Sequence, residues 1–142
     1  MNRADEPPLI LGLSHIAIAV PRLSEVGGWL SMFSSSEIQT YSSDEQAVNV
    51  MVLQIEGLQV ELMEPAHDES TISRFLDANP RGGLHHICFY VSDLEVAVRT
   101  MKDKGVRSIT RGLQNSIMHG APISFFNPRD LNGVLVEFEE IR

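Results

Sequence analysis

The sequence predicts an α+β fold made of two β-α-β-β-β modules that share one sheet, because the two halves of the chain repeat. A histidine and five neighbouring positions recur 71 residues later, and each copy is followed by an apolar strand with one glutamate. A chain of 142 residues suffices for one domain with a true core but is short for two. The matched pairs are Gly12/Gly83, Leu13/Leu84, His15/His86, Ile16/Ile87, Val20/Val91 and Leu23/Leu94.

The elements of the first module follow from alternation and turn residues. Residues 13–20 alternate as a strand, with His15, Ala17 and Ala19 on one face. Residues 23–33 predict a weak helix, since two glycines and three serines lie in or next to it. Further strands are predicted at 37–41, 48–55 and 58–63, with the last two joined by a hairpin turn at Gly57.

The second module repeats this order. Residues 84–91 form a strand that groups His86 and Cys88 on one face. Ser92 or Asp93 then caps a helix that ends at Gly105. Strands are predicted at 107–110, 123–126 and 133–138, with a turn at residues 127–130.

These elements predict the organisation of the whole chain. Residues 1–10 form a loose arm, and residues 11–142 form a single domain. Within it, module one covers about 11–66, a linker with a short helix over 72–76 covers 67–82, and module two covers about 83–142.

Composition excludes several classes of function. The formal net charge of −8 argues against general binding of nucleic acid or of anionic membranes, which needs an extended basic surface. The single cysteine excludes an intrachain disulfide, and the chain has no long apolar run. The first residues resemble neither a secretory nor a transit peptide, so we expect a soluble cytoplasmic protein.

Four side chains at repeat-equivalent positions predict a divalent-metal site. His15, Glu61, His86 and Glu137 all lie on the faces of their strands that are opposite to the apolar residues. Imidazoles and carboxylates suit Zn, Co, Ni, Fe or Mn. A carboxylate on an inner face is costly to desolvate unless it is paired or bound to metal.

Other polar residues leave alternatives open. His85 faces the opposite way from His86 and is expected to pack or hydrogen-bond, or else to replace His86 as ligand. His67 lies in a polar loop and is expected to be solvated. His119 and Gly120 lie in the longer loop of module two, where they either reach over a cleft or form an ordinary glycine turn.

Two further features bear on the site. Cys88 is interpreted as a small lining residue rather than a nucleophile. Positive charge is concentrated in module two, which offers candidates for binding a phosphate, namely Lys102, Lys104, Arg107, Arg111 and Arg129.

Five strings give the chain a family resemblance that runs from Leu11 onward. Together they resemble the methylmalonyl-CoA epimerases of the vicinal-oxygen-chelate (VOC) superfamily, which also includes glyoxalase I and extradiol dioxygenases. The strings are LSHIAIAVP (13–21), VELMEP (60–65), DESTISRFL (68–76), GLHHIC (83–88) and GVLVEF (133–138).

The resemblance implies a fold and a set of ligands. It implies two βαβββ modules in a U-shaped mixed sheet around a metal, commonly in a homodimer. By motif, His15, His86 and Glu137 match the family's metal ligands, and Glu61 matches a fourth ligand position.

The resemblance also implies an activity. It is the metal-dependent epimerisation of methylmalonyl-CoA or a related 2-substituted malonyl-CoA thioester, by α-proton abstraction and stabilisation of the enediolate. Glu137 would be the first base, with Glu61 opposite it. Arg129, in the turn, would meet a phosphate of CoA, and His119 and Gly120 would contact substrate.

Three alternatives compete with this interpretation. A glyoxalase I-type enzyme uses the same four-ligand arrangement on a glutathione hemithioacetal. An extradiol dioxygenase needs Fe(II) held by two histidines and one carboxylate, which His15, His86 and Glu137 could supply. A metal-free binding protein of the same fold would have no need of four intact ligands.

Overall fold

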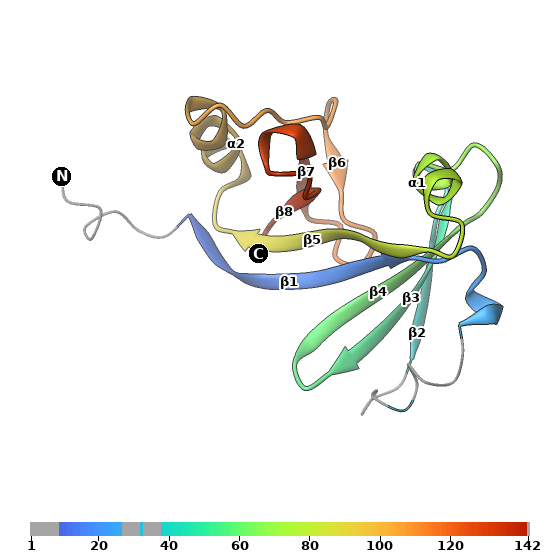
Figure 1. Ribbon diagram of the computed structural model, residues 1–142. Coiled ribbons are helices and arrows are strands. Elements are labelled where there is room, and N and C mark those ends of the chain that lie inside the picture. Colours follow the sequence, from blue (N-terminus) through green and yellow to red (C-terminus); the bar gives the residue numbers. More distant parts are fainter. Residues whose placement is uncertain (1–8, 27–31, 33–37, 142) are drawn as a thin grey trace. The chain divides into compact units, whose positions relative to one another are not determined.

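A computed structural model describes residues 9–26, 32 and 38–141, and the chain divides into two compact units (Figure 1). The N-unit is His15–Ile87. The C-unit combines Cys88–Arg142 with the start of the chain, Met1–Ser14. Each unit has its own sheet strands and its own apolar cluster.

The N-unit contains strands in the order β2, β3, β4, β1. Strands β3 and β4 form an antiparallel hairpin, β2 pairs antiparallel with β3, and β1 pairs parallel with β4, so the sheet is mixed. The bounds are β1 (Ile10–Ala19, in this unit from His15 on), a 3-10 turn (Leu23–Glu25), β2 (Gln39–Ser43), β3 (Val48–Ile55), β4 (Leu58–Pro65) and α1 (Ser73–Ala78).

The C-unit contains strands in the order β5, β8, β7, β6. Strand β7 pairs antiparallel with β6 and with β8. The bounds are β5 (Gly83–Val91, in this unit from Cys88 on), α2 (Leu94–Asp103), β6 (Gln114–Asn115), β7 (Pro122–Phe126), a 3-10 turn (Pro128–Asp130) and β8 (Val136–Glu140).

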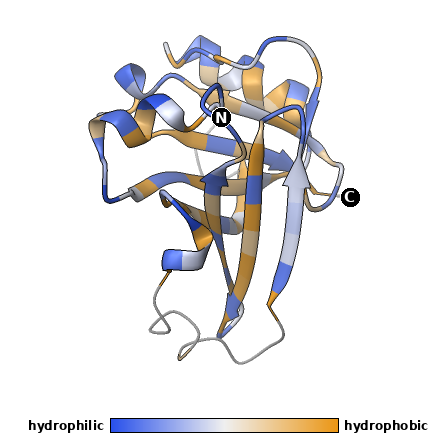
Figure 2. Ribbon diagram, turned by 90° about the vertical axis from the view of Figure 1, so that its right-hand side faces the viewer, coloured by the Kyte–Doolittle hydropathy of each residue, from blue (hydrophilic) through white to orange (hydrophobic). Residues whose placement is uncertain are grey.

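Alternating side chains build the two apolar clusters, and Figure 2 shows hydrophobic and hydrophilic bands alternating along the strands. In the N-unit, Leu53, Val60 and Leu62 are buried together. In the C-unit, helix α2 packs against Phe126 and Phe138, whose rings meet edge to face at 4.8 Å. Asp93 caps α2 by accepting a hydrogen bond from the backbone N–H of Val96.

Most of the predicted elements are confirmed. Strands β1, β3, β4, β5 and β7 and helix α2 lie where the alternation and capping patterns place them, and α1 lies in the expected linker. Strand β2 begins at Gln39, somewhat later than predicted. Of the weak helix predicted at 23–33, the structure describes a 3-10 turn at Leu23–Glu25, and most of the remainder lies outside the described residues.

The strand predicted at 107–110 is wrong. Only Ser108 makes an isolated bridge, to Phe126. Two backbone hydrogen bonds flank this bridge, from the N–H of Ile109 to Phe125 and from the N–H of Asn127 to Arg107. Side chains end the ladder there: Asp130 accepts hydrogen bonds from the backbone N–H and the guanidinium of Arg107, and the Thr110 hydroxyl accepts one from the backbone N–H of Phe125.

The strand predicted at 133–138 instead begins at Val136 and runs to Glu140. Asn132 and Gly133 both have positive φ, and the N–H of Val134 bonds back to Leu131, so this stretch is a turn. Strand β6, in the longer loop of the second module, was not predicted. With two residues, it is too short to show a period.

Among the glycines of the N-unit that the structure describes, Gly82 should be the least replaceable. A Cβ at this residue would lie 2.3 Å from the backbone oxygen of Ala19, and its φ is +88°. Gly57 has nearly the same φ, +82°, but open space around it. We expect Gly57→Ala to cost about 1–2 kcal/mol of unfolding free energy, from φ strain alone, and Gly82→Ala to cost clearly more.

Urea unfolding of the two variants measures this difference, because the φ strain is common to both. Equal losses in unfolding free energy would show that the contact with Ala19 does not constrain the chain.

Candidate metal centre

Three predicted ligands meet in the N-unit. His15 comes from β1, Glu61 from β4 and His86 from the first half of β5. The parallel register sets Ala17 opposite Glu61, so His15 and Glu61 project to the same face of the sheet. The alternation read from the sequence therefore holds in three dimensions.

The donor atoms of these three residues are close together and shielded from water. His15 Nε2 lies 3.2 Å from His86 Nε2 and 3.2 Å from Glu61 Oε2. One donor atom from each residue falls within 4.8 Å of the others. His15, Glu61 and His86 are 4%, 8% and 5% exposed.

This donor set fits a divalent cation. Two imidazole nitrogens and a carboxylate oxygen are ligands that Zn, Co, Ni, Fe and Mn share. The two imidazoles face one another through Nε2, and a buried carboxylate requires a positive partner. A cation between them satisfies all three groups, so the residues present are chemically suited to hold a metal ion.

His85 supports the candidate metal centre by contacting His86. Its Nδ1 lies 2.8 Å from Nδ1 of His86, and its ring stacks edge to face with that of Phe75 at 5.2 Å. His86 thus engages His85 through one ring nitrogen and faces His15 through the other. Of the alternatives left open by the sequence, packing and hydrogen bonding describe His85, and His86 belongs to the donor set.

The fourth predicted ligand, Glu137, lies in the C-unit on β8. It is buried, next to the fully buried Cys88. Burial raises the pKa of the Cys88 thiol well above its usual range, and the nearby charges of Glu137 and Glu139 raise it further. Cys88 is therefore a neutral thiol, in keeping with a lining residue rather than a nucleophile.

The predicted substrate-binding residues also lie in the C-unit. The side chain of His119 is hydrogen-bonded to Glu139, with 2.7 Å between Nδ1 and Oε1. The neighbouring Gly120 has φ +63°, and Arg129 is exposed on the 3-10 turn. Of the other candidate cations, Arg107 is paired with Asp130 at 2.9 Å.

Sequence reasoning missed Glu139. It lies on the same face of β8 as Glu137, is almost fully buried, and binds both His119 and Ser14. The sequence did contain a signal for Glu139: it lies two residues after Glu137, and side chains two residues apart on a strand point to the same face.

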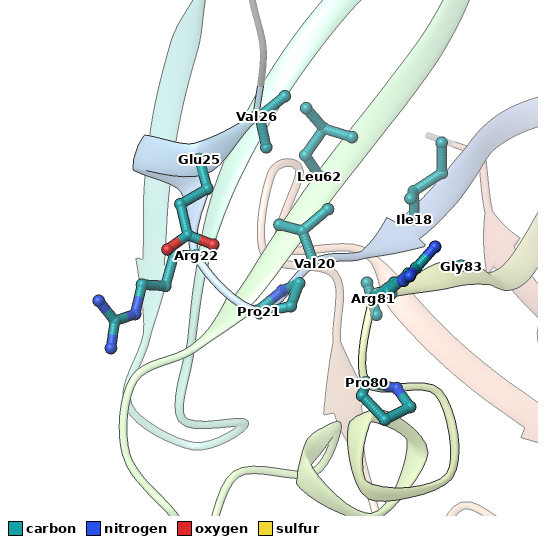
Figure 3. A pocket seen from close by; sticks show the side chains of 12 residues that line it. Ile18, Val20, Pro21, Arg22, Glu25, Val26, Leu62, Pro80, Arg81 and Gly83 are labelled. Atoms are coloured by element: carbon teal, nitrogen blue, oxygen red, sulfur yellow. The ribbon is translucent and has the colours of Figure 1, made fainter.

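A separate hollow of about 520 Å³ lies in the N-unit (Figure 3). Its apolar lining includes Ile18, Val20 and Leu62, and Arg22 and Arg81 also border it. These apolar residues have the opposite parity from His15 and Glu61, so the hollow lies on the other face of the sheet. It is not part of the metal centre.

Within residues 9–26, 32 and 38–141, no helix is both long and apolar enough to cross a bilayer.

The fold and the histidine and glutamate donors define the class of protein. Residues 14–125 match the family described as the Glyoxalase/Bleomycin resistance protein/Dioxygenase superfamily, and the chain belongs to it. It is 38% identical over 129 residues to the mitochondrial methylmalonyl-CoA epimerase of Dictyostelium discoideum. The aligned residues cover 90% of this chain and 77% of that relative.

Two further matches are similar in kind. The ethylmalonyl-CoA/methylmalonyl-CoA epimerase of Cereibacter sphaeroides is 35% identical over 130 residues, covering 91% of this chain and 97% of the relative. The structure of Streptomyces coelicolor methylmalonyl-CoA epimerase with 2-nitronate-propionyl-CoA matches with a TM-score of 0.80 and 29% identity, covering 91% of this chain and 96% of that one.

Within the superfamily, the chain therefore belongs to the methylmalonyl-CoA epimerase family and has the α+β VOC fold. These matches indicate an isomerase. They favour the epimerase interpretation over the glyoxalase I-type enzyme and the metal-free binding protein.

The donor set should make stability depend on metal. Excess Co²⁺ at about 100 times its dissociation constant should stabilise the protein by about 2.7 kcal/mol and raise its melting temperature. His15→Ala should lose this rise, whereas His67→Ala, in an exposed loop, should keep it. Melting curves with Co²⁺ and with EDTA, together with elemental analysis, provide the measurement; an undiminished rise in His15→Ala would contradict the site.

Cys88 should resist thiol reagents in the native protein. It is fully buried, and its raised pKa keeps the thiolate scarce at pH 8. Titration with an aromatic disulfide should therefore detect almost no thiol in native protein and one thiol per chain in guanidinium chloride. Rapid native labelling would show that Cys88 is accessible and ionised.

Proposed function

We propose that this protein is a metal-dependent epimerase of methylmalonyl-CoA, or of a closely related 2-substituted malonyl-CoA thioester. The observation that carries the proposal is the convergence of His15, Glu61 and His86 donor atoms in a buried site. Relatives named for epimerases of methylmalonyl-CoA and ethylmalonyl-CoA support the substrate class.

His15, Glu61, His86 and Glu137 would hold the ion. The first three are supported by their distances, and Glu137 by its repeat-equivalent position to Glu61. Lewis acidity toward the oxygens where enediolate charge develops is the chemistry that a divalent ion supplies here. Co, Ni, Zn and Mn all suit these ligands.

Proton transfer at C2 would fall to the carboxylates. Epimerisation needs an acceptor on one face of C2 and a donor on the other. Glu137 is the proposed first base, since it is buried on β8. Glu61 is the proposed group opposite it.

Binding of the CoA thioester would use the C-unit loops. Arg129 is exposed and carries a cation suited to a phosphate of CoA. His119 and Gly120 lie in the loop before β7 and would contact the acyl end. The relative solved with 2-nitronate-propionyl-CoA supports an acyl-CoA ligand.

The oligomeric state and the cellular location of the protein are also part of the proposal. We propose a homodimer, supported by the exposed apolar residues Ile10, Leu11 and Leu13 at the start of β1. We propose a cytoplasmic protein that binds neither membranes nor nucleic acid, supported by the acidic composition. The module boundaries 11–66, 67–82 and 83–142 stay predictions.

Deuterium exchange tests the function directly. Wild-type protein loaded with Co²⁺ should wash solvent deuterium into C2 of methylmalonyl-CoA, as followed by NMR. His86→Ala should reduce exchange to background, because it removes a ligand. Absence of exchange in metal-loaded wild-type protein would overturn the epimerase assignment.

The same assay separates the role of Glu137 from metal binding. Glu137→Gln should lower exchange by about a hundredfold, as expected for loss of a general base. A variant that keeps its metal, by elemental analysis, and full turnover would rule Glu137 out as the base.

A further inference from the structure

Glu61 lies between an alanine and a valine on the face of the N-unit sheet that carries His15, which we call the donor face. The register places Ala17 of β1 opposite Glu61 on one side and Val52 of β3 opposite it on the other. Side chains directly opposite in paired strands point to the same face, with Cβ atoms about 5 Å apart in an antiparallel pair. Val52 therefore borders the Glu61 side chain.

The donor face continues as an apolar surface toward the end of β1. In the next row, Ala19 of β1 and Val50 of β3 lie opposite Met63 of β4. These three side chains are at most 3% exposed, and Val52 is 2% exposed. Because Val50 and Val52 are two residues apart on one strand, they share the donor face and follow one another along it.

The row on the other side of Glu61 is polar. There His15 lies opposite Gln59 in the parallel pairing, and the amide of Gln54 donates a hydrogen bond to the amide oxygen of Gln59 at 3.4 Å. The donor face thus changes from polar to apolar at Glu61. This change matches a ligand with a polar end and an alkyl group, since burial of apolar surface against apolar side chains is favourable.

The two valines point away from the apolar cluster of the N-unit. That cluster is built on Leu53, Val60 and Leu62, which have the opposite parity and lie on the other face of the sheet. Val50 and Val52 therefore place their bulk on the side of the sheet that holds the donors.

The proposed function would bring C2 of the substrate to this part of the donor face. Glu61 is proposed to exchange a proton at C2, which requires an approach to about 3 Å, directly or through one water. The alkyl group is bonded to C2 itself, so it would lie among the side chains that border Glu61. Of the two residues opposite Glu61, Ala17 ends at Cβ, and Val52 is the bulkier.

We propose that Val50 and Val52 limit the size of the alkyl group on C2, and so make the protein prefer methylmalonyl-CoA over thioesters with a longer alkyl group. The inference rests on the proposed function, because it uses Glu61 as a group that acts at C2. Protein interiors are close-packed, so one added methylene is felt. A hydrophobic pocket discriminates one methylene by about tenfold or more.

The exchange assay with two thioesters tests the valines directly. The measured quantity is kcat/KM for deuterium wash-in at C2 of methylmalonyl-CoA and of ethylmalonyl-CoA, with metal-loaded protein. Val52→Ala and Val50→Ala should each lower the ratio of methylmalonyl-CoA to ethylmalonyl-CoA activity about tenfold. Val52→Ile, which adds a methylene, should raise this ratio. An unchanged ratio in both alanine variants would overturn the proposal.

Val48→Ala is the matched control. Val48 lies on the same strand and face, is 1% exposed, and pairs with Pro65 about 13 Å along the strand from Val52. The same chemical change there should leave the activity ratio at the wild-type value, even where it lowers the melting temperature as much. A change in the ratio as large as that of Val52→Ala would show that general loosening of the sheet sets the preference, and would overturn the proposal.

Binding gives a readout that does not depend on turnover. Calorimetry with metal-loaded protein measures the dissociation constants of both thioesters, and Val52→Ala should shift their ratio toward ethylmalonyl-CoA by a similar factor. If the wild-type protein binds both thioesters without exchange at C2, the epimerase proposal fails, and the ratio of dissociation constants still tests the valines. Exchange in the wild type, with both ratios unaltered in Val52→Ala and Val50→Ala, would overturn the role of the valines alone.

Discussion

The N-unit depends on one constraint, which is that two imidazoles and a carboxylate share a buried space. Such groups are stable away from water only when each has a partner of suitable charge. The parallel pairing of β1 with β4 brings His15 and Glu61 to one face, and β5 adds His86. The fully buried Ala17 and Ala19 continue that face, while Leu62 faces the apolar cluster. The pair of strands β1 and β4 thus carries donor residues on one face and core residues on the other.

The C-unit meets the same constraint in a different way. Its strand β8 carries two buried glutamates on one face and Phe138 on the other. Glu139 is satisfied by a hydroxyl and an imidazole, so it needs no metal. Burial, together with the charges of the two carboxylates, raises the pKa of Cys88 and keeps it in its neutral form. Neighbouring acids on one strand can therefore hold different roles, because their partners differ.

Apolar periodicity predicted the strands where backbone ladders and burial agree. The β3 and β4 hairpin and helix α2 follow that rule, since alternation, the turn at Gly57 and the Asp93 cap all indicate the same structure. The rule fails at residues 107–110. There Asp130 and Thr110 bind backbone groups that a strand would pair, and a hydropathy pattern carries no information about such side-chain contacts.

The sequence by itself determined which residue types occur and which face of each strand they share. That was enough for the repeat, the strand parity and the candidate ligands, because a two-residue period is a local property. Only the tertiary structure decided the partners. Ser14 and Glu139 are far apart in the chain yet bonded, and Arg107 is paired with Asp130. Partners depend on strand register and loop conformation, which long-range packing sets.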